Sequence, residues 1–251
     1  MSTTLYHGEP NGPSLTVLAA LFEKSVDAHL VAIDLTKAER HQLAVARQPE
    51  LAMGVEGEGP VLVVNGEALT DSVFVACYLD DIGHGTALRP ADPYERWSMM
   101  AWCRQIIERT APAAAYLGCK AYPPRAFPAA LDAIESVDLR ARWDAAVAGH
   151  SHAEKIADSE NKIIQTVAKI EARLNGRDWL MGDFSIADLE SYAWLAGMTE
   201  LVPAAFEAAP RTQAWMDRVK ARPAVQKALA LASVAAPERC WAPGPEINRW
   251  G

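Results

Sequence analysis

The segment from Gly59 to Ser72, with the sequence GPVLVVNGEALTDS, constrains the fold of this chain more tightly than any other. The apolar run from Val61 to Val64 predicts a short strand, and Asn65-Gly66 is a dipeptide that favours a two-residue hairpin turn. Residues 67–69 then form the returning strand. Asp71-Ser72 precedes a segment with helical periodicity, where both residue types favour a helix start. The segment therefore predicts a hairpin that leads directly into a helix.

Both ends of this segment offer polar groups to a ligand. Pro60 stands where a strand begins and a missing N–H is tolerated, and a cis bond before it in a tight turn would expose the main chain of Gly59. An extended peptide can pair with such a backbone. Free N–H groups at the helix start, together with the Ser72 hydroxyl, fit a carboxylate. The segment is thus interpreted as a site for a small, anionic, peptide-like molecule, while a plain helix cap and an edge-strand proline remain the simpler alternative.

Composition limits the class of protein. The chain has 251 residues, half of them hydrophobic, which is enough for two domains with a substantial core. A formal net charge of −8 argues against a nucleic-acid partner or an anionic membrane. No apolar run reaches the length of a membrane span, and the first residues do not resemble a signal peptide. Four irregularly spaced cysteines suit reduced thiols. We therefore expect a cytoplasmic protein, with neither nucleic acid nor membrane as partner.

The order of predicted elements divides the chain into two domains and an arm. A strand ending at His7, a helix that contains Leu15 and Phe22, and a strand over residues 28–33 precede the hairpin, which gives an α/β layer. Strand patterns end near Pro93, and helical patterns follow. The predicted boundaries are an α/β domain over residues 1–84, an all-helical domain over 92–235 and a proline-rich arm over 236–251, which we expect to dock on the body or on a partner. The predicted helical segments are 94–116, 128–147, 152–174, 185–198, 212–221 and 224–233.

One helix start in the second domain has a specific signature. Ser185-Ile-Ala-Asp188 forms a capping box, with Phe184 and Leu189 placed as a hydrophobic staple, so Asp188 is predicted to be structural. His150 and His152 are two residues apart and do not share a helix face, so we assign no metal.

In combination, these motifs resemble the glutathione S-transferase superfamily. The resemblance implies a thioredoxin-like first domain, an all-helical second domain, and glutathione as the bound cofactor. It further implies that Gly59 and Pro60 bind the cysteinyl main chain of glutathione and that Asp71 and Ser72 hold its γ-glutamyl end. Family members dimerise, so the resemblance also implies a homodimer or a heterodimer with a paralogous subunit.

Three further segments resemble the bacterial β-etherase branch, whose members cleave β-aryl ether bonds of lignin-derived aromatic dimers. They are LYHGEPNGPSLTVLAALFEK, ALRPADPYERWSMMAW and QAWMDRVKARPAV. In that branch, glutathione thiolate displaces a phenol from the carbon beside a ketone. The resemblance implies that the protein must keep the thiol ionised, and Ser14, near the start of the first helix, is our candidate for the stabilising group. An equally good interpretation makes Ser14 a simple N-cap residue.

The chain also departs from the family pattern. Pro13 precedes Ser14 where relatives carry a polar residue, and Gly59 replaces a customary valine. Within the segment that contacts the glycyl carboxylate in relatives, we select Gln48 and interpret most of the other polar residues as an exposed helix face. Those other residues are Lys37, Arg40, His41 and Arg47.

Two sets of aromatic and imidazole side chains are weaker candidates. His7 can lie at the rim of the site, and an aromatic pool of Trp97, Trp102, Tyr116 and Tyr122 can line an aryl pocket or belong to the core. Three functions stay open: aryl ether cleavage, general conjugation of small electrophiles, and a weakly active glutathione-binding subunit that stabilises a catalytic paralogue.

Overall fold

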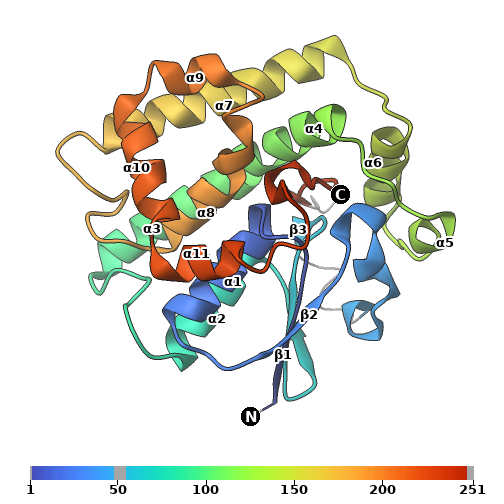
Figure 1. Cartoon of the computed structure of the whole chain (residues 1–251), viewed down its shortest axis with the longest axis horizontal. Helices are drawn as coiled ribbons and strands as arrows, with labels where there is room; N and C mark the ends of the chain where they lie inside the picture. The colour runs from blue at the N-terminus through green and yellow to red at the C-terminus, as the bar shows by residue number, and fades with distance from the viewer. Residues whose placement is uncertain (1, 48–54, 248–251) are drawn as a thin grey trace.

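The computed structural model describes residues 2–47 and 55–247. Its first part is a four-stranded mixed sheet in the order β2-β1-β4-β5, with β1 and β2 parallel and the other two pairs antiparallel. Helix α1 connects the two parallel strands, and α2 follows β5 (Figure 1). The thioredoxin-like arrangement predicted from the sequence is confirmed. The bounds are β1 Thr3–His7, α1 Gly12–Glu23, β2 His29–Ala32, β4 Val61–Val64, β5 Glu67–Leu69 and α2 Ser72–Ile82.

The hairpin has the predicted turn. Val64 pairs with Glu67, and the two residues between them, Asn65 and Gly66, have φ angles of 52° and 92°. Positive φ at both central positions matches the right-handed twist of the strands, and asparagine and glycine tolerate it best. The local sequence alone therefore determines the register of β4 and β5.

The expectation of a cis bond before Pro60 is wrong, because the Gly59–Pro60 peptide is trans. Residues just before it are already held extended by pairing between β3 (Val55–Glu56) and β6 (Glu246–Ile247), and the Glu58 N–H donates to the Pro243 carbonyl at 3.3 Å. The chain therefore enters β4 without the tight turn that a cis bond would supply.

The second part of the chain is helical and lies above the sheet in Figure 1. Helices are found in all the predicted segments, but 94–116 is two helices joined by a π-helical turn at Ile106–Thr110, 128–147 is two separate helices, and α9 was not predicted. The bounds are α3 Pro93–Gln105, α4 Ala111–Ala121, α5 Pro128–Leu131, α6 Val137–Val147, α7 Ala153–Arg173, α8 Ile186–Leu195, α9 Pro203–Glu207, α10 Pro210–Lys220 and α11 Pro223–Leu229.

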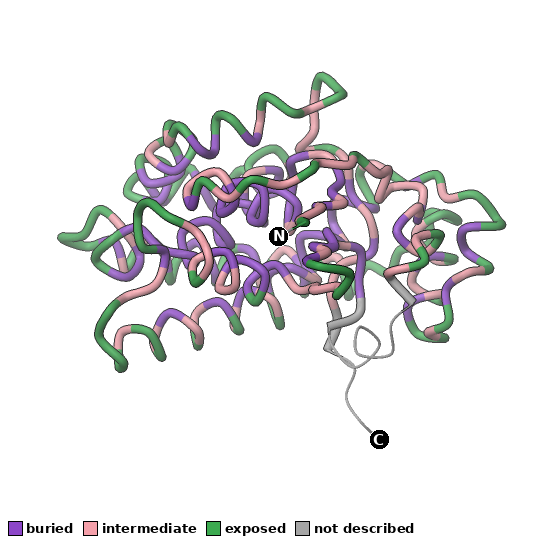
Figure 2. Tube along the Cα trace, turned by 90° about the horizontal axis from the view of Figure 1, so that it is seen from below, coloured by how far each residue is buried: buried purple, intermediate pink, exposed green. Residues whose placement is uncertain are grey.

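One hydrophobic core runs through both domains. Its buried residues come from the sheet, from α1 and α2 and from most of the helical domain, and Figure 2 shows this continuous buried interior. Helix α8 is buried along its whole length. At the domain junction, Arg222 at the start of α11 forms a bidentate ion pair with Glu23 of α1 at 2.6 and 3.0 Å. The two domains therefore share one core and are also joined by an ion pair at their junction.

The predicted capping box at the start of α8 is present. The Asp188 carboxylate accepts hydrogen bonds from the Ser185 N–H at 3.0 Å, the Leu180 N–H at 3.0 Å and the Trp215 indole at 2.8 Å. It is fully buried. Asp188 thus caps α8 and also connects it to the segment at Leu180 and to α10 at Trp215. Its predicted structural role is confirmed.

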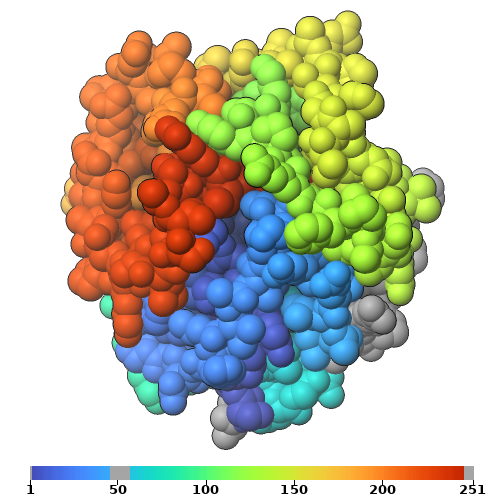
Figure 3. Space-filling model, turned by 45° about the vertical axis from the view of Figure 1, so that its right-hand side comes forward, coloured from blue at the N-terminus to red at the C-terminus, as the bar shows by residue number. Residues whose placement is uncertain are grey.

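The C-terminal arm packs on the body. Trp241 is 3% exposed and covers Gly118 of α4 and Gly197, where an added Cβ would lie 2.2 and 2.7 Å from the indole. In the space-filling view the red final segment lies between the orange helices and green α4 (Figure 3). The prediction that strands end near Pro93 is wrong for β6. This strand of the arm pairs with β3, which lies far away in the sequence, and the two form a separate antiparallel sheet.

Two negative findings apply to the described part of the chain. None of its helices is long and apolar enough to cross a membrane, and its side chains include no group of three potential metal ligands. The four cysteines are unpaired, with Cys103 and Cys119 buried.

Candidate functional site

Two neighbouring cavities lie where the first domain meets the helices and the arm. The smaller, here called the hairpin cavity, has a volume of about 40 Å³. It contains the ends of the Gly59 to Ser72 segment that the sequence selected. Its lining is Pro13, Gly57, Glu58, Gly59, Pro60, Thr70, Asp71, Ser72, Ile107, Glu190, Trp194 and Pro245. The structure thus brings together four of the six predicted site residues.

Asp71 is the N-cap of α2. Its Oδ1 atom accepts hydrogen bonds from the N–H groups of Val73 at 2.9 Å and Phe74 at 3.1 Å. Burial raises the pKa of this carboxyl, while the two N–H bonds act in the opposite direction. Its φ of 71° is rare for a residue other than glycine. The predicted cap is confirmed, and Asp71 lines the hairpin cavity.

Ser72 is buried and bonded across the domain junction. Its hydroxyl donates to Oε1 of Glu190 on α8 at 3.0 Å, and the Trp194 indole donates to the same oxygen at 2.7 Å. Burial raises the pKa of Glu190 to about 7. The first-domain site therefore includes a carboxyl group from the helical domain.

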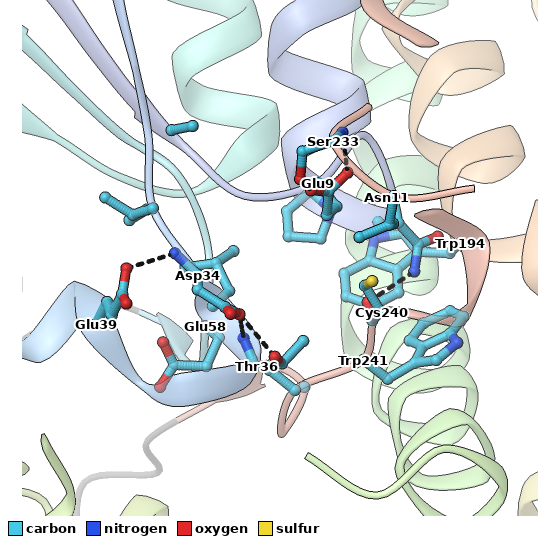
Figure 4. Close-up of a pocket in the computed structure, with 18 residues that line it drawn as sticks. Glu9, Asn11, Asp34, Thr36, Glu39, Glu58, Trp194, Ser233, Cys240 and Trp241 are labelled. Atoms are coloured by element: carbon cyan, nitrogen blue, oxygen red, sulfur yellow. Dashed lines mark hydrogen bonds between the residues drawn. The ribbon is translucent and has the colours of Figure 1, made fainter. Parts of the chain in front are cut away.

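The larger cavity, here called the outer cavity, has a volume of about 400 Å³. Figure 4 shows Trp194 and Trp241 on one side and the carboxylates of Asp34, Glu39 and Glu58 on the other. The remaining lining residues are Glu9, Asn11, Gly12, Pro13, Ala32, Ile33, Leu35, Thr36, Ser233, Val234, Cys240, Ala242 and Gly244. A volume of this size suits a small organic molecule.

Hydrogen bonds fix the acidic wall of the outer cavity. The Asp34 carboxylate accepts from the Thr36 hydroxyl at 2.6 Å and pairs with Lys37 at 2.8 Å, and although burial raises its pKa, these bonds hold the pKa below its usual value. Asp34 is therefore ionised at neutral pH. The Asn11 amide donates to the Cys240 carbonyl at 3.1 Å, which ties the arm to the start of α1.

Glu58 lies between the two cavities and lines both. Its Oε1 atom is bonded to the Trp143 indole at 2.8 Å and to His41 Nε2 at 2.5 Å.

Arg40 is buried rather than on an exposed helix face, which corrects the interpretation from sequence. Its guanidinium donates to the Gly57 carbonyl at 2.5 Å and to the Thr70 hydroxyl at 3.3 Å, so it holds together the two loops that border the hairpin cavity.

Ser14 is at the third position of α1 and is fully buried. Its hydroxyl accepts a hydrogen bond from the Gly8 N–H at 3.0 Å. The N-cap of α1 is Asn11, so the interpretation of Ser14 as the cap is wrong. The helix begins at Gly12, two residues before Ser14, so Ser14 lies inside its first turn and is buried. Pro13 lines both cavities, whereas Ser14 is not among the residues described around either one.

The other sequence candidates lie elsewhere. Gln48 falls outside the described residues. His7 is buried, with Nδ1 2.8 Å from the Gly8 carbonyl. The predicted aromatic pool does not line the two cavities: Trp97 is exposed, and the Trp102 indole donates to Ser191. The aromatic walls come instead from Trp194 and Trp241.

Sequence reasoning missed Glu190, Glu58, Trp194 and Trp241. Glu190 carried a usable signal, because it is a carboxylate inside the otherwise apolar run of α8. A charge at a core position of a helix needs a partner, and such positions are candidates for function. Glu58 gave no such signal, since its surroundings depend on α6. For Trp241 the sequence predicted docking of the arm, but not a place in a cavity wall.

Comparisons with known proteins agree with this architecture. Residues 136–223 match the family model described as the glutathione S-transferase, C-terminal domain. The chain is 27% identical to Protein LigF of Sphingobium sp. over 246 residues, covering 90% of this chain and 93% of that protein. The crystal structure of the β-etherase LigF superposes with a TM-score of 0.78 at 25% identity, covering 92% of this chain and 99% of the other. The chain therefore has the glutathione S-transferase fold, and its helical part matches the C-terminal domain of that family.

Two further proteins of known family are similar to this chain. Glutathione S-transferase 3 of Zea mays is 29% identical over 245 residues, covering 94% of this chain and 98% of that protein. A glutathione transferase family member from Pseudomonas fluorescens, solved with two glutathione molecules bound, has a TM-score of 0.65 at 18% identity, covering 91% of this chain and 92% of the other. At that identity the likeness extends to the fold alone.

Proposed function

We propose that this transferase uses glutathione to cleave β-aryl ether bonds of lignin-derived aromatic dimers. The observation that carries the proposal is the junction between the cavities, where Pro13, Glu58 and Trp194 line both. A γ-glutamyl group placed at Asp71 and Ser72, with its cysteinyl main chain at Gly59, directs the sulfur across this junction. The sulfur then faces the outer cavity at the start of α1.

The reaction assigns a distinct task to each part of the site. The glutathione thiolate forms a carbon–sulfur bond at the carbon beside the ketone, and the carbon–oxygen bond breaks as phenolate leaves with the electron pair and then takes a proton. The positive end of the α1 dipole favours the sulfur anion. Trp194 and Trp241 offer apolar faces to the aryl rings. The main contribution of the protein is to align the thiolate with an already activated carbon.

One observation favours a second candidate function, a weakly active subunit that stabilises a catalytic paralogue. Cys240 is a thiol inside the outer cavity, and burial, followed by the carboxylates of Glu9, Asp34 and Glu238, raises its pKa to about 11. The same carboxylates oppose ionisation of a glutathione thiol placed there. With Ser14 buried, the chain offers few groups that favour the thiolate.

A single set of measurements on the purified chain tests both functions. Calorimetry with glutathione tests binding, and product analysis with β-aryl ether ketones and with a general electrophile tests turnover. We expect binding together with phenol release from the ethers, at a rate that rises with pH because the thiolate is the nucleophile. Conjugation of the electrophile without ether cleavage would leave only the general transferase.

Two further outcomes separate the remaining readings. Binding of glutathione without cleavage of any ether, with activity appearing only after a paralogous subunit is added, would establish the second function. The absence of any heat with glutathione would overturn both. Ser14→Ala should leave turnover nearly unchanged, because the structure places its hydroxyl on the Gly8 N–H; a large loss at neutral pH that recovers at high pH would instead restore Ser14 as the thiol-stabilising group.

A further inference from the structure

Glu190 lacks the partners that a buried carboxylate requires. It is 0% exposed, and its Oε1 atom accepts hydrogen bonds from Ser72 and from Trp194, while the nearby Thr16 hydroxyl also acts to lower its pKa but carries no charge. Its Oε2 atom is buried without a hydrogen-bond partner. A buried acceptor of a charged group that is left unsatisfied destabilises the folded protein. Since Glu190 lines the hairpin cavity, a ligand in that cavity can supply the missing donor.

The charges around Glu190 do not compensate it. Among the ion pairs formed by the described residues, none includes Glu190. The titratable groups that act on it are the Asp71 carboxylate, at the start of α2, and the Cys103 thiol on α3, whose own pKa burial raises well above its usual value. The Asp71 carboxyl is acidic, and the Cys103 thiol stays neutral, so neither supplies a positive charge. The cavity at this end therefore has a surplus of negative charge and of hydrogen-bond acceptors.

We propose that Glu190 binds the α-ammonium group of the γ-glutamyl residue of glutathione. This inference rests on the proposed binding of glutathione and specifies which end of the ligand the helical domain recognises. Ser72, Asp71 and Glu190 border the same cavity, and the first two are the predicted γ-glutamyl contacts. An ammonium group donates three hydrogen bonds, so it can satisfy Oε2 of Glu190 and neutralise its charge.

Compensation of Glu190 also changes the role of Ser72. In the ligand-free protein the Ser72 hydroxyl donates its only hydrogen to Glu190. Once the ammonium group donates to Glu190, this hydroxyl can turn to the α-carboxylate of the ligand, beside the N–H groups at the start of α2. The γ-glutamyl end is therefore recognised as a zwitterion. A ligand that has the carboxylate but lacks the amine should bind poorly.

The test compares two ligands and three proteins by calorimetry. The ligands are glutathione and its deaminated analogue, in which hydrogen replaces the α-amino group. The proteins are the wild type, Glu190→Gln and the control Glu207→Gln, which removes the same charge from an exposed position. We expect the wild type and the control to bind glutathione at least 10-fold more tightly than the analogue. Glu190→Gln should bind the two ligands within about 2-fold of each other, because only the ammonium contact is lost.

A second measurement uses the wild type alone and so does not depend on whether the variant folds. An ammonium group beside Glu190 stabilises its carboxylate, so glutathione binding near pH 7 should release protons, seen as a dependence of the binding heat on the ionisation heat of the buffer. The deaminated analogue should release fewer. Equal proton release by the two ligands, or a 10-fold preference that persists in Glu190→Gln, would overturn the assignment of Glu190 and leave glutathione binding intact. Failure of the wild type to bind glutathione would overturn both.

Discussion

Replacing Glu190 by glutamine should stabilise the ligand-free protein above neutral pH. Burial raises the pKa of Glu190 from 4.5 to about 7, so the folded protein holds a proton that the unfolded chain has already lost between these values. The folded state therefore binds more protons than the unfolded state, and stability must fall as the pH rises from about 4.5 to about 7. Below this window both states are protonated and the term vanishes. Glutamine has no such term.

The magnitude follows from the size of the shift. One pKa unit corresponds to about 1.4 kcal/mol, so a shift from 4.5 to about 7 corresponds to about 3 kcal/mol of stability lost on ionisation. Glutamine retains a carbonyl that can accept from Ser72 and Trp194, though as a weaker acceptor than a carboxylate. We expect Glu190→Gln to gain about 1–3 kcal/mol relative to the wild type at pH 8 and to show no gain at pH 4.5.

Urea unfolding of both proteins between pH 4.5 and pH 8 measures this difference directly. Asp188→Asn is a matched control, because Asp188 is a second buried carboxylate next to Glu190 on α8, with a pKa raised by burial to about 6. Its difference from the wild type should change between about pH 4 and pH 6 and stay constant above pH 7. If the difference between Glu190→Gln and the wild type does not vary with pH, Glu190 is not the uncompensated carboxyl inferred here.

The remaining predictions concern packing and folding. Asp188→Ala should destabilise the protein by about 3–5 kcal/mol, more than the loss of a helix cap alone, because the Leu180 N–H and the Trp215 indole lose a buried acceptor. The glutathione affinity of the folded protein should be unchanged. A variant with the wild-type melting temperature but no turnover would contradict the structural role of Asp188. Trp241→Ala should lower the free energy of unfolding by about 2–4 kcal/mol and enlarge the outer cavity. Trp241→Phe removes a buried indole N–H that has no partner, so it should lower that free energy by less than half as much. Equal melting temperatures for the wild type and Trp241→Ala would show that the arm is not docked.

Local sequence determined the elements that depend on neighbouring residues. Asn65 and Gly66 specify the hairpin turn because few other residues accept positive φ at both positions. Asp71 and the Ser185–Asp188 box specify two helix starts through hydrogen bonds that span three residues. The order of helical and strand patterns gave the two domains, and the resemblance to a known family implied ligand-binding roles for four residues of the hairpin cavity.

Tertiary structure decided the properties that depend on contacts between distant segments. The sequence placed Ser14 at a helix start, but only the packing of α1 shows that its hydroxyl points into the core and accepts from Gly8. Arg40 has a polar sequence environment, and the loops at Gly57 and Thr70 bury it.

The site itself is assembled across the domain junction. Glu190 meets Ser72 across 118 residues of sequence. Trp241 covers Gly118 of α4, and Cys240 is bonded to Asn11 at the start of α1, only because the arm docks on the body. Charge and hydrogen bonding at these points depend on which groups lie within a few ångströms after folding. Periodicity and turn chemistry describe neighbours along the chain, so they specified the elements; the partners of Glu190, Glu58 and Trp241 became definite only in the folded protein.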